Sequence, residues 1–225
     1  MSEFNQEELS KEYDSHNDEK EIMLNDLKNL ITASKGSLEG NSFYVHLSLQ
    51  LYPELYKKQV NLFWCGKQAS TRICEIGFNA GHSTMLMLLG REKTPIDFTI
   101  FDIGEHPYTK PCFEYIKNKF DNVNFEYIEG DSVGTMPKWI KENPSLANSF
   151  DVVHIDGGHS ENCIKNDMLN SDLLVKLDGI VIIDDTNMSH INRYVDLYLS
   201  SGKYKELDII KTTGYPHRVI TKIQF

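Results

Sequence analysis

The chain has 225 residues, a length that fits one domain with a core large enough to be stable without disulfides or metal sites. Hydrophobic residues make up 40% and charged residues 25%, as in soluble globular proteins, and no apolar run approaches the roughly 20 residues of a membrane-spanning helix. The formal net charge is −10 without a basic stripe, which argues against a nucleic-acid partner.

The N-terminus and the four cysteines bear on the cellular compartment. The first residues, MSEFNQEELSKEYD, are acidic and polar, unlike a signal or transit peptide. No two cysteines form a C-x-x-C pair, which argues against zinc or thioredoxin chemistry, and we interpret all four as reduced and mostly as core residues: Cys65, Cys74, Cys112 and Cys163. We therefore expect a cytoplasmic protein.

Helical patterns come first along the chain. Residues 1–21 are dense in charged and amide side chains, which fits either a disordered arm or a polar helix. Residues 22–34 carry apolar side chains at helical spacing, and residues 43–64 form a second helical stretch with a break near Pro53. We expect residues 1–65 to form an N-terminal arm with helices that serve as a lid or a dimer contact.

Strands and helices alternate through the remaining domain, residues 66–225. Short apolar or alternating segments predict seven strands, at residues 72–77, 97–102, 123–128, 150–156, 179–184, 206–211 and 218–225. Helical segments separate the first five strands, at residues 84–89, 112–120, 137–142 and 163–176. This alternation predicts an α/β fold with a mostly parallel sheet and helices on both faces. Residues 212–216 are too few for a helical crossover, so the last two strands are expected to pair antiparallel.

Ligands of parallel sheets bind where the strands end. The first strand runs into EIGFNAGHST, residues 75–84, in which the glycines allow a tight turn and the close approach of a ligand. The helix that starts near Gly81 offers free N–H groups to an anion, and Ser83 adds a hydroxyl. The spacing E-x-G-x-x-x-G departs from G-x-G-x-x-G, which argues against a pyrophosphate cradle. A plain strand-to-helix turn is the alternative interpretation.

The next two strands end in polar residues that suit an adenosine ligand. Asp102 ends the second strand, where a carboxylate can accept both hydroxyls of a ribose, or else cap a helix or lie at the surface. Asp131 and Ser132 follow the third strand, where they can bond an adenine edge or cap the next helix. Three strand ends that each fit one part of the ligand favour adenosine binding more than any one of them alone.

The fourth and fifth strands end in Asp156 and in Asp184-Asp185. Neighbouring parallel strands would bring these carboxylates together, and unpaired buried carboxylates are costly. A divalent cation removes that cost, and oxygen ligands at a half-open site suit Mg²⁺. The alternative is that Asp185 caps a helix and Asp156 faces solvent. His159 lies three residues after Asp156, where it can accept a proton near neutral pH or have a structural role at a helix N-terminus.

Together, the motifs CEIGFNAGHS, FTIFDIG, IEGDS, HIDGGHS and VIIDDTN resemble those of the class I S-adenosylmethionine-dependent methyltransferases, over about residues 70–225. Within that class the chain is similar to the metal-dependent O-methyltransferases, the group that contains catechol O-methyltransferase and the sugar O-methyltransferases of macrolide biosynthesis. The resemblance implies a Rossmann-like, seven-stranded, mostly parallel sheet with an antiparallel last strand and helices on both faces, preceded by an N-terminal helical extension.

The resemblance also implies roles for the candidate residues. Asp102 would hold the ribose of S-adenosylmethionine, Asp131 and Ser132 would lie at its adenine, and the rest of its site would comprise Glu75, Gly77, Phe78, Asn79, Gly81 and Ser83. Mg²⁺ would bind Asp156, Asp184 and Asp185, and His159 would take the proton of the acceptor. The catechol enzymes have Asn as the third metal ligand and Lys in the place of His159, so this chain departs toward the sugar-modifying branch.

The expected function is therefore methyl transfer to a hydroxyl of a small molecule or sugar. Two alternatives stand beside it. The first is an NAD(P)-dependent oxidoreductase, against which the missing middle glycine and the clustered carboxylates count. The second is an inactive S-adenosylmethionine-binding protein, against which the complete set of catalytic residue types counts. We expect neither a nucleic acid nor a membrane as partner, and the N-terminal helices are a candidate homodimer contact.

Overall fold

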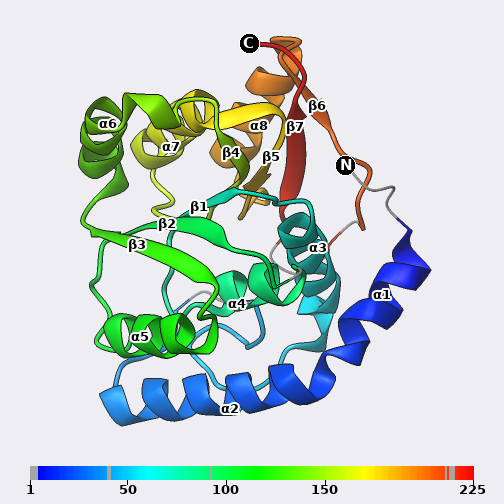
Figure 1. The fold of residues 1–225 in the computed structure, drawn as a ribbon, viewed down its shortest axis with the longest axis vertical. Coiled ribbons are helices and arrows are strands. Elements are labelled where there is room, and N and C mark those ends of the chain that lie inside the picture. Colours follow the sequence, from blue (N-terminus) through cyan, green and yellow to red (C-terminus); the bar gives the residue numbers. More distant parts are fainter. Residues whose placement is uncertain (1–4, 40–41, 92, 211, 213–215) are drawn as a thin grey trace.

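The computed structural model describes residues 5–39, 42–91, 93–210, 212 and 216–225, and its centre is a single sheet (Figure 1). Within the described residues the strands are β1 (Arg72–Ile76), β2 (Ile96–Asp102), β3 (Val123–Glu129), β4 (Phe150–Ile155), β5 (Val175–Ile183), β6 (Tyr204–Glu206) and β7 (Arg218–Lys222). Their order in the sheet is β3-β2-β1-β4-β5-β7-β6. Strands β1 to β5 pair in parallel, whereas β7 is antiparallel to both β5 and β6. The predicted sheet, with its antiparallel last strand, is confirmed.

Helices cover both faces of this sheet (Figure 1). One face carries α3 (Tyr56–Lys67), α4 (His82–Leu89) and α5 (Thr109–Lys119), and the other carries α6 (Ser132–Glu142), α7 (Glu161–Leu174) and α8 (Ser189–Ser200). Two N-terminal helices, α1 (Gln6–Ser15) and α2 (Asn17–Ser34), form an outer layer against α3 and α5. Short 3₁₀ turns occupy Pro53–Leu55 and Pro144–Leu146.

The central strands are apolar because both of their faces are covered. Every residue of β4 is buried, although the strand includes Asp151 and His154. Asp151 is paired with Lys176 and accepts hydrogen bonds from the backbone N–H groups of Thr71 and Arg72, at 2.6 and 2.8 Å. Its partners therefore make the burial of this carboxylate tolerable, and they hold the start of β1 beside β4.

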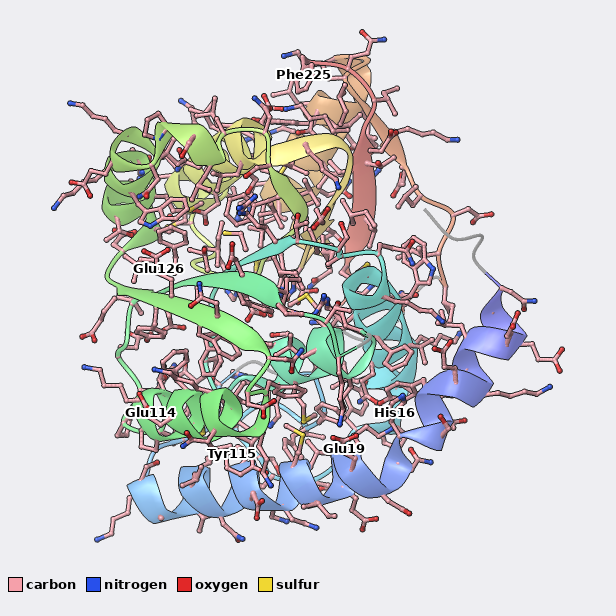
Figure 2. The ribbon with its side chains drawn as sticks, viewed as in Figure 1. His16, Glu19, Glu114, Tyr115, Glu126 and Phe225 are labelled. Atoms are coloured by element: carbon pink, nitrogen blue, oxygen red, sulfur yellow. The ribbon has the colours of Figure 1, made fainter. Side chains whose placement is uncertain are left out.

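Specific polar contacts attach the N-terminal helices to the rest of the fold. The Tyr13 hydroxyl of α1 donates to Oε1 of Gln59 in α3 at 2.7 Å, and both side chains are buried. The Tyr115 hydroxyl of α5 donates to Oδ2 of Asp26 in α2 at 2.7 Å, and Figure 2 shows Tyr115 where these two helices face each other. The polar-helix interpretation of residues 1–21 is thus correct for the described part of that segment.

The helix predicted over residues 43–64 is wrong in its first half. Helix α3 begins only at Tyr56, after the 3₁₀ turn at Pro53–Leu55, and an isolated bridge joins Tyr44 to Leu51. The cause is Pro53, because a proline restricts the preceding residue to extended backbone and lacks the N–H that a helix needs. Tyr52 has φ −116° and ψ 96°, as this restriction predicts.

Other elements also differ from the prediction. The helix predicted to run through Lys176 ends at Leu174, because β5 starts at Val175. The predicted strand at residues 206–211 is shorter and earlier, at Tyr204–Glu206, and residue 211 lies outside the described residues. Helix α8 was not predicted, although Ile191 and Val195 are buried at helical spacing.

The four cysteines are free, and three of them are buried core residues, as predicted: Cys65, Cys74 and Cys112. Cys163 is half-buried instead. None of the helices in the described part of the chain combines the length and the apolar character needed to cross a lipid bilayer.

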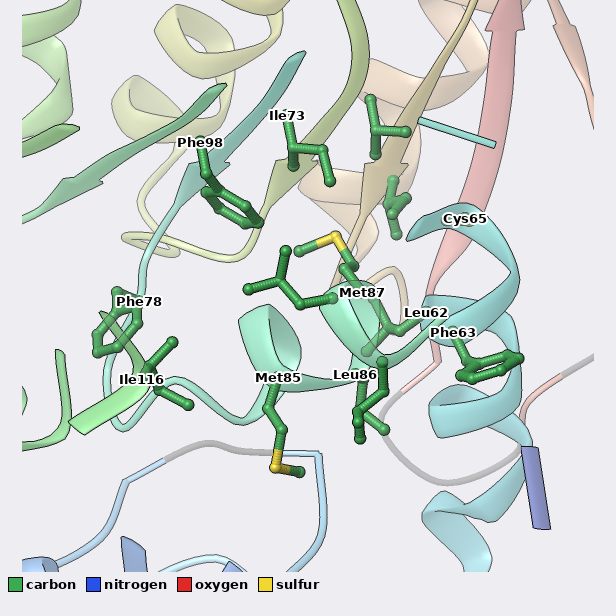
Figure 3. Packing of buried hydrophobic residues seen from close by; sticks show 14 of the residues in the cluster. Leu62, Phe63, Cys65, Ile73, Phe78, Met85, Leu86, Met87, Phe98 and Ile116 are labelled. Atoms are coloured by element: carbon green, nitrogen blue, oxygen red, sulfur yellow. The ribbon is translucent and has the colours of Figure 1, made fainter. Parts of the chain in front are cut away.

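Helices α3 and α4 approach closely through two glycines. Helix α4 packs between the sheet, which contributes Ile73 and Phe98, and α3, which contributes Leu62 and Phe63 (Figure 3). A Cβ at Gly66 of α3 would lie 1.9 Å from the backbone oxygen of Met87. A Cβ at Gly90, just after α4, would lie 2.0 Å from the backbone oxygen of Phe63. The two helices are thus in backbone contact at two neighbouring points, near the C-terminal end of each.

We therefore expect Gly66→Ala and Gly90→Ala each to lower the free energy of unfolding by about 3 kcal/mol, because a helix backbone must move to admit the methyl group. The matched control is Gly134→Ala in α6, where no described atom lies within 4 Å of an added Cβ. That change should be neutral or raise stability by up to about 1 kcal/mol. Urea unfolding of the three variants tests this, and equal losses in all three would contradict it.

Candidate active site

A cavity of about 720 Å³ opens at the carboxyl ends of β1, β2, β4 and β5. Ten of the predicted site residues line it: Gly77, Phe78, Asn79, Ser83, Asp102, Asp131, Ser132, Asp156, His159 and Asp185. The other three lie outside its lining: Glu75, Gly81 and Asp184. The N-terminal segment contributes three lining residues that the sequence did not single out: Glu39, Ser42 and His46.

The turn after β1 needs glycine at its first position. Gly77 has φ +92°, and a Cβ there would lie 2.0 Å from the backbone oxygen of Asp156. The ends of β1 and β4 are in backbone contact at this point, since the Asp156 N–H donates to the Ile76 oxygen at 2.8 Å. The turn therefore brings the loop after β1 and the loop after β4 to the same edge of the cavity.

Asp102 organises this turn. Its Oδ2 accepts hydrogen bonds from the backbone N–H groups of Phe78 and Asn79, at 2.8 and 2.9 Å, and its Oδ1 accepts from Gly104 N–H at 2.7 Å. The Asn79 side chain in turn donates from Nδ2 to the Glu39 oxygen at 2.5 Å. The carboxylate that was predicted to hold a ribose thus also fixes the turn, and the turn contacts the N-terminal segment.

Glu75 lies behind the cavity and accepts hydrogen bonds from residues of the helix that forms part of its wall. The side chain is fully buried in β1, and its Oε1 accepts from the Ser83 hydroxyl at 2.5 Å. Thr84, the next residue of α4, also donates to the Glu75 carboxylate. Glu75 therefore holds the first turn of α4 against the sheet, and of these residues it is Ser83 that reaches the cavity.

Asp131 and Ser132 occupy the N-terminus of α6. The Asp131 side chain caps this helix, since its Oδ1 accepts from the Val133 N–H at 3.0 Å, and Ser132 is the first helical residue. The capping interpretation is therefore correct for Asp131. Because both residues also line the cavity, a bound ligand would meet this helix N-terminus.

His159 and Asp185 face each other across the cavity edge beside Asp156. The His159 Nε2 lies 2.8 Å from Oδ2 of Asp185, and this contact raises the pKa of His159. The donor atoms of Asp156, His159 and Asp185 all lie within 4.8 Å of one another. Burial and the neighbouring Asp184 raise the pKa of Asp156. Helix α8 begins four residues after Asp185, so Asp185 is not the cap of that helix.

Asp184 instead forms a buried ion pair with Lys58 of α3. The Lys58 Nζ lies 2.5 Å from Oδ2 of Asp184, and the two side chains are 4% and 1% exposed. Burial alone would raise the pKa of Asp184, but Lys58 and His154 hold it well below its usual range. Burial would likewise lower the pKa of Lys58, but the Asp184 and Asp156 carboxylates raise it overall.

His154 links this ion pair to Glu75. The two residues are partners in the register of β1 and β4, and His154 Nδ1 lies 2.9 Å from Oε1 of Glu75. His154 Nε2 lies 3.6 Å from Oδ2 of Asp184. Burial works against a charge on His154, but its contacts with Asp184 and Glu75 raise its pKa to about 10. Two cations, Lys58 and His154, therefore balance two carboxylates, and the cluster can remain buried.

His217, just before β7, completes the surroundings of Asp184. Its Nδ1 lies 3.6 Å from Oδ1 of Asp184, and its Nε2 lies 2.8 Å from Nδ2 of Asn61 in α3. Burial lowers the pKa of His217 to about 3, so its ring is neutral at neutral pH. Because the Asn61 amide donates to Nε2, the ring proton lies on Nδ1, toward Asp184.

The sequence did not single out Lys58, Asn61 or His217. Lys58 follows another lysine, Lys57, and the sequence does not distinguish them. In the structure Lys57 is exposed, whereas Lys58 is buried. A pattern that could have indicated them is a lysine and an asparagine one helical turn apart, directly before the apolar run LFWC. The interpretation of His154 as a packed residue within a strand is correct, although its two charged partners were not foreseen.

Carboxylates and a helix N-terminus at the carboxyl ends of parallel strands define a ligand-binding α/β protein of the Rossmann-like type. The model of a family described as a methyltransferase domain matches residues 74–186, just over half of the chain. The chain therefore belongs to this family of methyltransferase domains. The resemblance to class I methyltransferases is confirmed, and the match favours this interpretation over an oxidoreductase.

Solved structures share the fold over most of the chain at low sequence identity. The O-methyltransferase from Bacillus cereus in complex with SAH is 16% identical, with 90% of this chain and 91% of that chain covered and a TM-score of 0.62. Cofactor-bound Rv0187 from MTB is 15% identical, with 91% of each chain covered and a TM-score of 0.63. The O-methyltransferase TomG from Streptomyces achromogenes, in complex with SAM, is 14% identical, with 75% and 80% covered and a TM-score of 0.55. No curated protein matches the chain.

One buried carboxylate lies beneath the cavity. The Asp167 side chain of α7 is fully buried, and its Oδ2 would lie 3.7 Å from a Cβ at Gly157, a lining residue. Burial raises the pKa of Asp167 to about 6. A folded-state pKa above the unfolded value means that the folded protein binds this proton more tightly, so stability falls as the pH rises from the unfolded value to about 6.

We expect Asp167→Asn to abolish this loss of stability with rising pH. At pH 8 the free energy of unfolding should rise by about 2–3 kcal/mol, because no charge is then buried. The control is Asp178→Asn, at an exposed position of β5, which should leave the pH profile unchanged. Urea unfolding at several pH values between 4 and 8 measures the effect. An Asp167→Asn profile parallel to that of the wild type would contradict it.

Proposed function

We propose that the chain is an S-adenosylmethionine-dependent O-methyltransferase that moves a methyl group to a hydroxyl of a small molecule or sugar, with assistance from Mg²⁺. The observation that carries the proposal is one cavity that joins two kinds of group. The first kind comprises the turn after β1, Asp102 and the α6 N-terminus, and the second comprises Asp156, His159 and Asp185. The similarity to the O-methyltransferases of Bacillus cereus, with SAH, and Streptomyces achromogenes, with SAM, supports it.

The cofactor would lie along the turn after β1. Asp102 reaches the cavity, and the acceptor site not used by its three backbone donors would accept a ribose hydroxyl. Asp131 and Ser132 would meet the adenine, and Ser83 would meet the methionine part. We assign Glu75 the indirect role of holding Ser83 in place, because its carboxylate is buried behind the wall.

The groups near His159 fit a divalent cation. Asp156 and Asp185 supply carboxylate oxygens at the cavity surface, and the contact between Asp156 and other carboxylates explains why a positive charge would be favourable there. A bound divalent cation would orient an acceptor oxygen and lower the pKa of its hydroxyl.

His159 would take the proton from the acceptor. Its side chain is 53% exposed at the cavity, and Asp185 orients the ring through Nε2 at 2.8 Å. This contact raises the pKa of His159, which makes the neutral ring a stronger proton acceptor. The attacking oxygen must then lie in line with the methyl group, roughly 3 Å from it, which is a task of positioning for the cavity walls.

The N-terminal segment would cover the acceptor. Glu39, Ser42 and His46 line the cavity, which supports the lid role of residues 1–65. A dimer contact through the N-terminal helices and a cytoplasmic location remain predictions. Transfer of a labelled methyl group from S-adenosylmethionine to a panel of sugars and phenols tests the proposal. Label transfer to a hydroxyl is expected, and cofactor binding without transfer to any acceptor would favour the inactive alternative.

His159→Ala should reduce turnover by about 10²–10⁴-fold without changing the affinity for S-adenosylhomocysteine, because only proton removal is lost. Lys165→Ala, at an exposed position of α7, is the control and should retain full turnover. Steady-state rates and calorimetric titration of both variants separate the two effects. Full turnover of His159→Ala would show that His159 is not the base.

A further inference from the structure

The three aspartates that the resemblance assigns to a metal do not share one environment. Asp156 and Asp185 line the cavity, whereas Asp184 lies outside its lining and its side chain is 1% exposed. Two sets of potential ligands arise among the described residues, and Asp156 belongs to both. The inner set adds His154 and Asp184, and the outer set adds His159 and Asp185.

Lys58 already forms an ion pair with the Asp184 carboxylate. Its Nζ lies 2.5 Å from Oδ2, and its side chain is 4% exposed, so the ammonium is almost entirely buried against this carboxylate. Lys58 is held there by the packing of α3, which is buried from Lys58 to Gly66. A dication at Asp184 would have to approach a fixed ammonium, and two like charges at contact distance repel strongly in a buried site.

Nitrogen atoms also surround the rest of the inner set, although among the described residues only His154 Nδ1 lies within hydrogen-bonding distance of a partner. His154 Nδ1 contacts Glu75 at 2.9 Å, and His154 Nε2 faces Asp184 at 3.6 Å. The second oxygen of Asp184, Oδ1, faces the Nδ1 of His217 at 3.6 Å. The inner set therefore presents N–H and ammonium groups to Asp184 from three elements, α3, β4 and the segment before β7.

The outer set, by contrast, carries no buried ammonium group and is partly exposed at the cavity. Two carboxylates and one imidazole lie with their donor atoms within 4.8 Å of one another, and Asp185 and His159 are 18% and 53% exposed. The two carboxylates match the charge of a dication, and their oxygens are the ligands that Mn²⁺ and Mg²⁺ prefer, while His159 lies beside them.

We propose that Lys58 is an internal cation that removes Asp184 from the metal site, so that a divalent cation binds only to Asp156 and Asp185, beside the base His159. The inference rests on the proposed function for the presence of a cation, and it changes the ligand set that the resemblance implies. Lys58 is a positioning residue here, since it fixes Asp184 and through it the charge next to the cavity.

Titration with Mn²⁺, followed by the electron paramagnetic resonance signal of the free ion, tests the inference without any acceptor or turnover. The first variant replaces the whole pair by apolar residues, Lys58→Met/Asp184→Leu, a type of change that is often neutral or stabilising. It should bind Mn²⁺ as the wild type does. Asp185→Asn is the matched comparison and should weaken binding at least about tenfold, as loss of a ligand or its partner does.

The single variant Lys58→Met gives a second measurement. Asp184 then loses its ammonium and becomes free to join the ligand set, so Mn²⁺ affinity should rise at least about tenfold. Thermal unfolding establishes that each variant is folded, and the pair variant decides the question if Lys58→Met does not fold.

Three results would overturn the inference: a pair variant that loses as much Mn²⁺ affinity as Asp185→Asn, a folded Lys58→Met variant with unchanged affinity, or a wild type that does not bind Mn²⁺. Titration of the same samples with S-adenosylhomocysteine keeps the two proposals apart. Nucleoside binding without the expected Mn²⁺ pattern would refute the ligand set alone, whereas loss of nucleoside binding in the wild type would refute the proposed function.

Discussion

Lys58 of α3 and Asp184 at the end of β5 bury opposite charges in direct contact, and the functional end of the sheet is arranged around them. Removing either partner of such a pair would leave an unpaired buried charge and cost several kcal/mol, so this pair joins α3 to the sheet. Through His154 and Glu75 the same cluster reaches Ser83, at the start of α4. One buried network of polar contacts therefore connects α3, the sheet and the start of α4, which forms part of the cavity wall.

This network separates structural carboxylates from those available to ligands. Glu75 and Asp184 are buried and paired with cations, whereas Asp102 and Asp185 reach the cavity. Residues that a motif places side by side, such as Asp184 and Asp185, therefore differ in chemistry. The left-handed backbone of Asp185, with φ 53°, turns the chain between them, so that one carboxylate points to Lys58 and the other to His159.

Much of the fold and most of the site followed from local patterns. Apolar strands and the short 212–216 link predicted the sheet, because strand burial and loop length are local properties. Residues 43–52, the start of β5 and both bounds of β6 were mispredicted, because Pro53 and tertiary packing decide those boundaries. Lys58 was missed since its role depends on a contact with Asp184, far away in the sequence, which no local pattern encodes.

The central claim is that the cavity at the carboxyl ends of β1, β2, β4 and β5 binds S-adenosylmethionine. Calorimetric titration of the wild type with S-adenosylhomocysteine, in Mg²⁺ and again in EDTA, with NAD as the control ligand, tests it most directly. We expect micromolar binding of the nucleoside and no binding of NAD. Binding of NAD with no binding of S-adenosylhomocysteine, even in the presence of Mg²⁺, would contradict the claim.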